Sequence, residues 1–271
     1  MTRRYVMSIP KTEGKKKSMR LVRAIAICVL GIVFLFALYK VVSIGLDYQK
    51  VDEFYEETQE EFTPRDVLNE KWGVSLPEVD FDSLTEVNDN IIAWIYIPDT
   101  NVSFPVLKGK DNQQYLYQSY EKEYLTAGSI FIDYRCRKSF SDRHTVIYGH
   151  NMHNGSMFGS LKKYKDEEYK DEHPYVYILR ANGDVNRYQI FAYYQAAVDG
   201  PVFELPSQKD CSDGKFERLA TTIFEANQYE PVTSGTGLAG EKYITLTTCT
   251  QDSRNDVRVC ISARLCDGGK L

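Results

Sequence analysis

An uncharged stretch near the N-terminus, preceded by a cluster of basic residues, constrains the architecture of this 271-residue chain more than any other feature. Residues 24–39 contain no charged side chain, and at about 1.5 Å per residue they cover roughly 24 Å of a hydrocarbon core about 30 Å thick. Residues 41–46 continue the apolar pattern, and the ammonium of Lys40 can extend to the interface on its aliphatic stem. The pattern predicts one transmembrane helix over residues 24–46.

The charges on the two sides of this stretch predict its orientation. Residues 1–23 form a basic tail with Arg3, Arg4, Lys11, Lys15, Lys16, Lys17, Arg20 and Arg23. The segment that follows the stretch is acidic, with Asp47, Asp52, Glu53, Glu56, Glu57, Glu60 and Glu61. The positive-inside rule therefore predicts a cytoplasmic N-terminus and a single-pass protein of the cell membrane whose folded part is extracellular. A cleaved signal peptide has a similar layout, but no small-x-small cleavage site followed by a mature start is evident.

The rest of the chain divides into a stalk and a folded domain. Residues 47–89 are predicted to be an extracellular stalk with N-terminal helices, because Val51 and Tyr55 have helical spacing. Prolines at positions 64 and 77 predict two short helices here in place of one long helix. Residues 90–271 are the predicted domain. The formal net charge is −5, and the chain after the apolar stretch is acidic overall, so the charge gives no indication of nucleic-acid binding.

Short apolar runs separated by turns predict a mainly β domain. Strands are expected over residues 91–97, 102–107, 128–132, 145–148, 175–179, 188–197, 243–248 and 257–265. The 20 tyrosines, against 2 tryptophans, also suit strands. Two helices are expected, over residues 156–164 and 213–227. Eight strands suggest a barrel or a sandwich with peripheral helices.

Cys249 is the candidate nucleophile among the six cysteines. It ends the strand expected over 243–248, at the junction with a polar loop. Strand alternation puts Thr245, Thr247 and Cys249 on one face, which we expect to point away from the core. If the next strand pairs antiparallel, Cys249 and Arg258 become neighbours on that face. Of the others, Cys28 lies in the apolar stretch, and packing or disulfide roles of open connectivity are expected for Cys136, Cys211, Cys260 and Cys266.

His150 is the candidate base because it ends an apolar strand that is closed by a glycine, where a rigid element can present a side chain to a cleft. His144, His153 and His173 are expected to be solvated surface histidines. A zinc site at His150 and His153 is an alternative, but a second clear pair of ligands is missing. We therefore expect neither a metal nor another cofactor.

Several segments in a fixed order carry a family resemblance. Residues 147–161 read IYGHNMHNGSMFGSL, residues 244–250 read ITLTTCT, and an apolar strand follows Arg258. They resemble the histidine motif, the nucleophile motif and the terminal arginine strand of sortases, the Gram-positive cell-wall transpeptidases. Residues 111–116 are similar to a DN-x-x-YL pattern of class B sortases. The helical insertion expected before Cys249 and the expected N-terminal helices also resemble class B members.

The resemblance implies an eight-stranded β-barrel and a thiol transpeptidase. It implies that Cys249 attacks the peptide bond after Thr in the C-terminal sorting signal of a secreted protein, forming a thioester that an amino group of a peptidoglycan precursor or a pilin resolves. It assigns acid and base roles to His150 and oxyanion stabilisation or substrate alignment to Arg258. The predicted substrate contacts are Asn112, Leu116 and Thr247, of which Thr247 stands where class B members often have Ser.

Two other classes of function remain open at this point. One is a different extracellular cysteine hydrolase, or an L,D-transpeptidase that acts on cell-wall peptides. The other is a membrane-anchored, non-catalytic β-domain that binds the wall, in which Cys249, His150 and Arg258 would be incidental.

Overall fold

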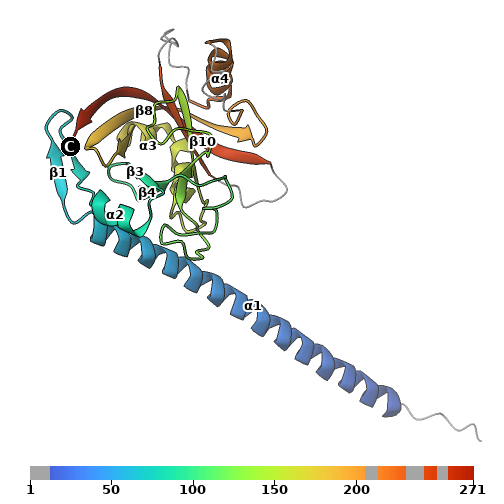
Figure 1. Ribbon diagram of the computed structural model, residues 1–271. Helices are drawn as coiled ribbons and strands as arrows, with labels where there is room; N and C mark the ends of the chain where they lie inside the picture. The colour runs from blue at the N-terminus through green and yellow to red at the C-terminus, as the bar shows by residue number, and fades with distance from the viewer. Residues whose placement is uncertain (1–12, 205–212, 230–240, 249–255) are drawn as a thin grey trace, which may run out of the picture. The chain divides into compact units, whose positions relative to one another are not determined.

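The computed structural model describes residues 13–204, 213–229, 241–248 and 256–271. The chain divides into two compact units, Met1–Lys50 and Val51–Leu271. The described part of the first unit is helical and belongs to α1 (Glu13–Phe62), which continues into the second unit (Figure 1). By length and composition α1 can cross a membrane, and its most apolar window is not buried, although a signal sequence would have the same properties. An apolar helix is thus present where the sequence predicts one.

The end of α1 differs from the prediction of two short helices. The helix continues without a break to Phe62. It ends two residues before Pro64, because the helical conformation is disfavoured for the residue that precedes a proline. In the second unit its buried side chains Val51, Tyr55 and Phe62 recur at helical spacing. The Tyr55 ring packs edge-on against Phe104 at 5.2 Å, and its hydroxyl donates to the Gly128 carbonyl at 2.6 Å. This stretch of α1 is part of the core of the second unit.

A hairpin and then one short helix follow α1. The prediction of a second helix is therefore right, but the sequence did not predict the hairpin that precedes this helix. Strands β1 (Asp66–Asn69) and β2 (Val74–Pro77) pair antiparallel, and α2 runs over Phe81–Val87. Asp80 caps α2, since its side chain accepts from the Ser83 amide at 3.1 Å.

Eight strands close into a barrel, which confirms the predicted fold class. The order around the barrel is β10-β8-β7-β3-β4-β5-β6-β9. Their bounds are β3 Ile91–Tyr96, β4 Ser103–Leu107, β5 Ile130–Ile132, β6 His144–Gly149, β7 Tyr175–Leu179, β8 Asp184–Ala197, β9 Tyr243–Thr248 and β10 Val257–Lys270. Two neighbouring pairs, β4 with β5 and β6 with β9, are parallel. The parallel β6–β9 pair brings two distant sequence segments side by side.

In the described part of the chain, three helical segments lie between the later strands. The 3-10 helix η1 (Phe158–Lys165) and α3 (Glu167–Glu172) lie between β6 and β7, and α4 (Asp213–Ala226) lies between β8 and β9. The expected helices over 156–164 and 213–227 correspond to η1 and α4. Phe216 of α4 packs against Tyr243 of β9, with ring centroids 5.2 Å apart.

The predicted outward face of β9 is wrong, because both faces of this strand are covered. All six residues of β9 are buried, Thr245 and Thr247 among them. The Thr245 hydroxyl lies 2.8 Å from His144 Nε2 and 2.8 Å from Ser262 Oγ. Strand alternation predicts which residues share a face, but it does not predict what covers that face. Here Tyr243 packs against α4, and Thr245 contacts His144 of β6 and Ser262 of β10.

Candidate active site

The candidate imidazole follows the end of β6, next to β9. Gly149 pairs with Thr248, the last described residue of β9, and His150 is the next residue after Gly149. A side chain at position 149 would meet Phe158 ring atoms at 2.6 Å, so close packing of η1 requires glycine there. The His150 ring lies 5.4 Å from the Tyr117 ring, and burial lowers the pKa of His150.

Cys249, the candidate nucleophile, lies outside the described residues. It directly follows Thr248 in the sequence, just as His150 directly follows Gly149. Four other cysteines are described, and Cys28, Cys136, Cys260 and Cys266 are all free thiols. Burial raises the pKa of Cys136 and of Cys260 to about 12, so both are protonated at neutral pH and unsuited to nucleophilic attack.

Arg258 lies near the start of β10, against two aromatic rings. Its guanidinium carbon is 5.3 Å from the centroid of the Tyr148 ring and 5.6 Å from that of Phe203. The two rings are stacked, with centroids 6.4 Å apart and planes inclined by 18°. Tyr148 is the β6 residue two before His150, so β6 carries a ring that contacts the candidate guanidinium and ends one residue before the candidate imidazole.

Thr247 is buried beside a cysteine. It pairs with Cys260 across β9 and β10, and the Cys260 thiol donates to the Thr247 hydroxyl at 3.4 Å. Arg258 precedes Cys260 by two residues on β10. Because β9 and β10 are antiparallel, Arg258 lies at the end of the pair where β9 ends. The substrate contact predicted for Thr247 stays a prediction.

Asn112 and Leu116 lie between β4 and β5. Both ends of the Asn112 side-chain amide have protein partners, since Nδ2 donates to Asp133 at 2.8 Å and Oδ1 accepts from the Tyr134 amide at 3.0 Å. Leu116 is half-buried in the same segment. The structure thus connects Asn112 to the end of β5, and the substrate contacts predicted for both residues stay predictions.

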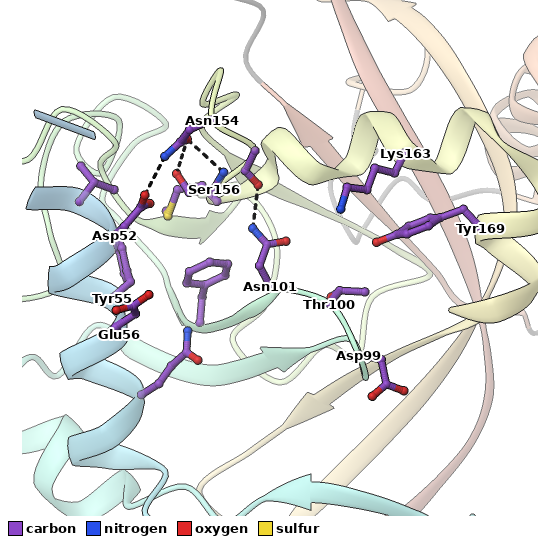
Figure 2. Close-up of a pocket in the computed structure, with 15 residues that line it drawn as sticks. Asp52, Tyr55, Glu56, Asp99, Thr100, Asn101, Asn154, Ser156, Lys163 and Tyr169 are labelled. Carbon is purple, nitrogen blue, oxygen red and sulfur yellow. Dashed lines mark hydrogen bonds between the residues drawn. The ribbon is translucent and has the colours of Figure 1, made fainter. Parts of the chain in front are cut away.

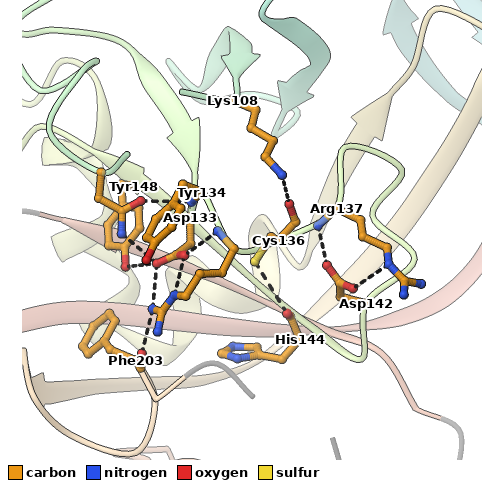
Figure 3. Close-up of polar contacts among 11 residues, drawn as sticks. Lys108, Asp133, Tyr134, Cys136, Arg137, Asp142, His144, Tyr148 and Phe203 are labelled. Carbon is orange, nitrogen blue, oxygen red and sulfur yellow. Dashed lines mark hydrogen bonds and ion pairs between the residues drawn. The ribbon is translucent and has the colours of Figure 1, made fainter. Parts of the chain in front are cut away.

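Sequence reasoning missed the residues around Arg258. Asp133 is fully buried and interacts with Arg135 and Tyr148 (Figure 3). Phe203 adds the second ring that contacts Arg258. One signal for Asp133 was present in the sequence, because a carboxylate directly follows the apolar run of β5. No local signal relates Phe203 to Arg258.

The other histidines are only partly as expected. His144 is buried, with 5% of its surface exposed, so the prediction of a surface histidine is wrong for it. His153 is exposed, and His173 is half-buried with Nδ1 3.1 Å from the Pro98 carbonyl. Within the described residues, no cluster of three or more His, Cys, Asp or Glu side chains could hold a metal ion.

A cavity of about 540 Å³ lies beside the segment that follows His150 (Figure 2). None of the predicted site residues lines it. At its rim Asn154 Nδ2 donates to the Asp52 carboxylate at 2.8 Å, and Asn101 Nδ2 donates to the Gly155 carbonyl at 2.7 Å. These contacts fasten the turn after His150 to α1 and to the β3–β4 connection.

Comparisons with known proteins identify the family of the chain. A family model described as the sortase domain matches residues 95–266. Sortase B of Listeria monocytogenes is 34% identical over 186 residues, which cover 67% of this chain and 72% of that protein. The crystal structure of sortase B from B. anthracis is similar with a TM-score of 0.65 and 30% identity, over 81% of this chain and 98% of that one. A Streptococcus pyogenes class B sortase involved in pilus biogenesis is similar with a TM-score of 0.59 and 26% identity, over 69% and 98% of the two chains.

Proposed function

Because the chain belongs to the sortase family and is a sortase B-type cysteine transpeptidase, we propose that Cys249, His150 and Arg258 form its active site. The observation that carries this proposal is the pairing of Gly149 with Thr248 where the parallel strands β6 and β9 end. Parallel neighbours end at the same edge of a sheet, and the residues that come next in the sequence are His150 and Cys249. This register supports an imidazole and a thiol that meet at one end of the barrel.

The first half of the proposed reaction forms a thioester. The Cys249 thiolate attacks the carbonyl carbon of the peptide bond that follows Thr in a C-terminal sorting signal. The C–N bond of the tetrahedral intermediate then breaks, and protonated His150 gives its proton to the leaving amine. The products of this half-reaction are the acyl thioester, neutral His150 and the released C-terminal peptide.

The second half-reaction transfers the protein. An amino group of a peptidoglycan precursor, or of a pilin, attacks the thioester carbonyl while neutral His150 accepts a proton from the attacking amine. The C–S bond breaks, the new amide leaves, and the thiolate and the imidazolium are restored. A similar class B sortase is involved in pilus biogenesis, so both kinds of acceptor belong in the test.

The protonation states limit the rate of this scheme. With ordinary pKa values of about 8.5 for Cys and 6.5 for His, the thiolate–imidazolium state is on the order of one per cent of the molecules near neutral pH. Burial lowers the pKa of His150, which makes the imidazolium rarer still. An additional source of transition-state stabilisation is therefore needed.

Arg258 is the proposed source of that stabilisation. Its side chain keeps its charge and cannot act as a base, whereas its N–H groups can donate to the oxyanion of each tetrahedral intermediate. Contact with the Tyr148 and Phe203 rings supports a fixed guanidinium. The predicted contacts of Asn112, Leu116 and Thr247 would align the sorting signal. An uncleaved apolar helix would hold the enzyme at the membrane, where both substrates are attached.

The test compares two cysteine variants of the full-length protein in detergent. Each is incubated with a small library of fluorogenic sorting peptides and with amine nucleophiles, and the products are identified by mass. Cys249→Ala is expected to abolish cleavage and transfer, because the thioester cannot form. Cys266→Ala is the matched control, since it removes a free, exposed thiol on β10 and is expected to retain full activity.

Unchanged turnover by the Cys249→Ala protein would contradict the assignment of the nucleophile. If the wild-type protein forms a covalent adduct with cell-wall peptides and never with sorting peptides, the proposed substrate class is wrong. The masses of the products also identify the recognised motif and the acceptor.

A further inference from the structure

A charged carboxylate is buried at the end of β5. Asp133 has no exposed surface and accepts from Arg135 Nε at 2.8 Å, from Asn112 Nδ2 at 2.8 Å and from the Tyr148 hydroxyl at 3.1 Å (Figure 3). Burial alone would raise the pKa of Asp133, but the hydrogen bonds from Arg135 and Asn112 outweigh it, and the pKa is lowered. Asp133 is therefore an anion at neutral pH.

Asp133 is linked to both residues whose rings contact the Arg258 guanidinium. One is Tyr148, whose hydroxyl is held by Asp133 and whose ring contacts Arg258. The other is Phe203, whose carbonyl accepts from Arg135 Nη2 at 3.0 Å while that same nitrogen donates to Asp133 at 2.9 Å. One carboxylate thus binds the Tyr148 side chain directly and, through Arg135, the backbone that carries the Phe203 ring.

We propose that Asp133 is a positioning residue that holds the Arg258 guanidinium in place through Tyr148 and through Arg135 and Phe203. This proposal rests on the proposed function, in which Arg258 stabilises the oxyanion. A donor stabilises developing charge best when it is already in position before the reaction, because no reorganisation is then needed. A misplacement of about 1 Å can lower a rate by about 100-fold.

A purely structural role is the competing explanation. An ion pair taken out of water adds little net stability, because desolvation offsets the attraction between the charges. The partners of Asp133 are Tyr148 on β6, Arg135 directly after β5 and Asn112 between β4 and β5. Two of them lead to the candidate site, since the Tyr148 ring contacts Arg258 and Arg135 donates to the Phe203 carbonyl. A structural role and a positioning role predict different results when Arg258 is also changed.

The kinetic test uses Asp133→Asn in the full-length protein in detergent, with the sorting peptide that the wild type cleaves best. We expect kcat to fall by about 10- to 100-fold, because the rings no longer hold the guanidinium. Asp184→Asn is the control, since Asp184 is bound by Arg180 at 2.7 Å at the β7–β8 turn, and its other partners among the described residues are Asn182 and Lys270. Its kcat should equal that of the wild type.

A double-mutant cycle with Arg258→Ala separates the two explanations. If Asp133 acts through Arg258, Asp133→Asn causes no further loss of kcat in the Arg258→Ala background. An equal loss in both backgrounds, or an unchanged kcat in a folded Asp133→Asn protein, would overturn the proposal. If Asp133→Asn does not fold, Tyr148→Phe replaces it in the cycle, because this change keeps the ring and removes only the hydroxyl that Asp133 binds.

NMR relaxation of the Arg258 side chain can be measured even if the protein is inactive. It therefore distinguishes failure of this proposal from failure of the proposed function. In protein labelled with ¹⁵N-arginine, the Nε–H signal of Arg258 is assigned by its loss in Arg258→Lys. Its relaxation should report an ordered side chain in the wild type and in Asp184→Asn, and a mobile one in Asp133→Asn. A mobile Arg258 in the wild type would overturn the positioning role, whereas an ordered Arg258 in an inactive wild type would overturn only the proposed function.

Discussion

At the scale of single residues, His144 shows how burial changes a side chain that resembles a surface histidine in the sequence. Its surroundings in the barrel lower its pKa to about 4 by burial. An unfolded histidine binds its proton near pH 6.5, so the unfolded state binds more protons between about pH 6.5 and 4, and stability falls by about 3 kcal/mol as the pH drops across that range. We expect His144→Gln to flatten the pH dependence of thermal unfolding, whereas His153→Gln, at an exposed position, should leave it unchanged. Identical pH profiles for the two variants would contradict this assignment.

At the scale of elements, the end of β6 and the start of η1 depend on each other. Gly149 lets the Phe158 ring approach the backbone directly before His150. An added methyl group would meet that ring and the Ile130 side chain at 2.6 Å, so Gly149→Ala is expected to lower the free energy of unfolding by about 1–3 kcal/mol. Gly214→Ala is the control, because among the described residues outside its own helical turn nothing lies within 4 Å of the added carbon in α4. Denaturant titration measures both, and equal stability of the two variants would exclude this packing constraint.

At the scale of the whole molecule, α1 contributes to both units. Val51, Tyr55 and Phe62 are buried in the second unit, and each such side chain contributes about 1.5–3 kcal/mol through burial. A chain that begins at Asp47 should therefore keep the unfolding temperature of the full-length protein, whereas a chain that begins at Arg65 should unfold at a clearly lower temperature. Thermal unfolding of the three proteins in the same detergent tests this, and equal midpoints would show that the end of α1 is dispensable for the fold.

Much of the barrel could be predicted because strand patterns are local. The runs predicted at 175–179 and 243–248 coincide with β7 and β9. The stretch after Pro64 could not be predicted in the same way. It contains the short strands of a hairpin, whose pairing depends on a partner and not on a period within the segment.

The sequence by itself determined the apolar helix, the eight strand segments along the chain, and the resemblance to the family, because periodicity and motif spacing are properties of contiguous residues. The structure decided that Gly149 and Thr248 are paired, that both faces of β9 are covered, and that Asp133 gathers Arg135, Asn112 and Tyr148. Such contacts join residues far apart in the chain. They exist only after the barrel closes, because closure makes β6 and β9 neighbours and encloses a carboxylate that would be solvated in the unfolded chain.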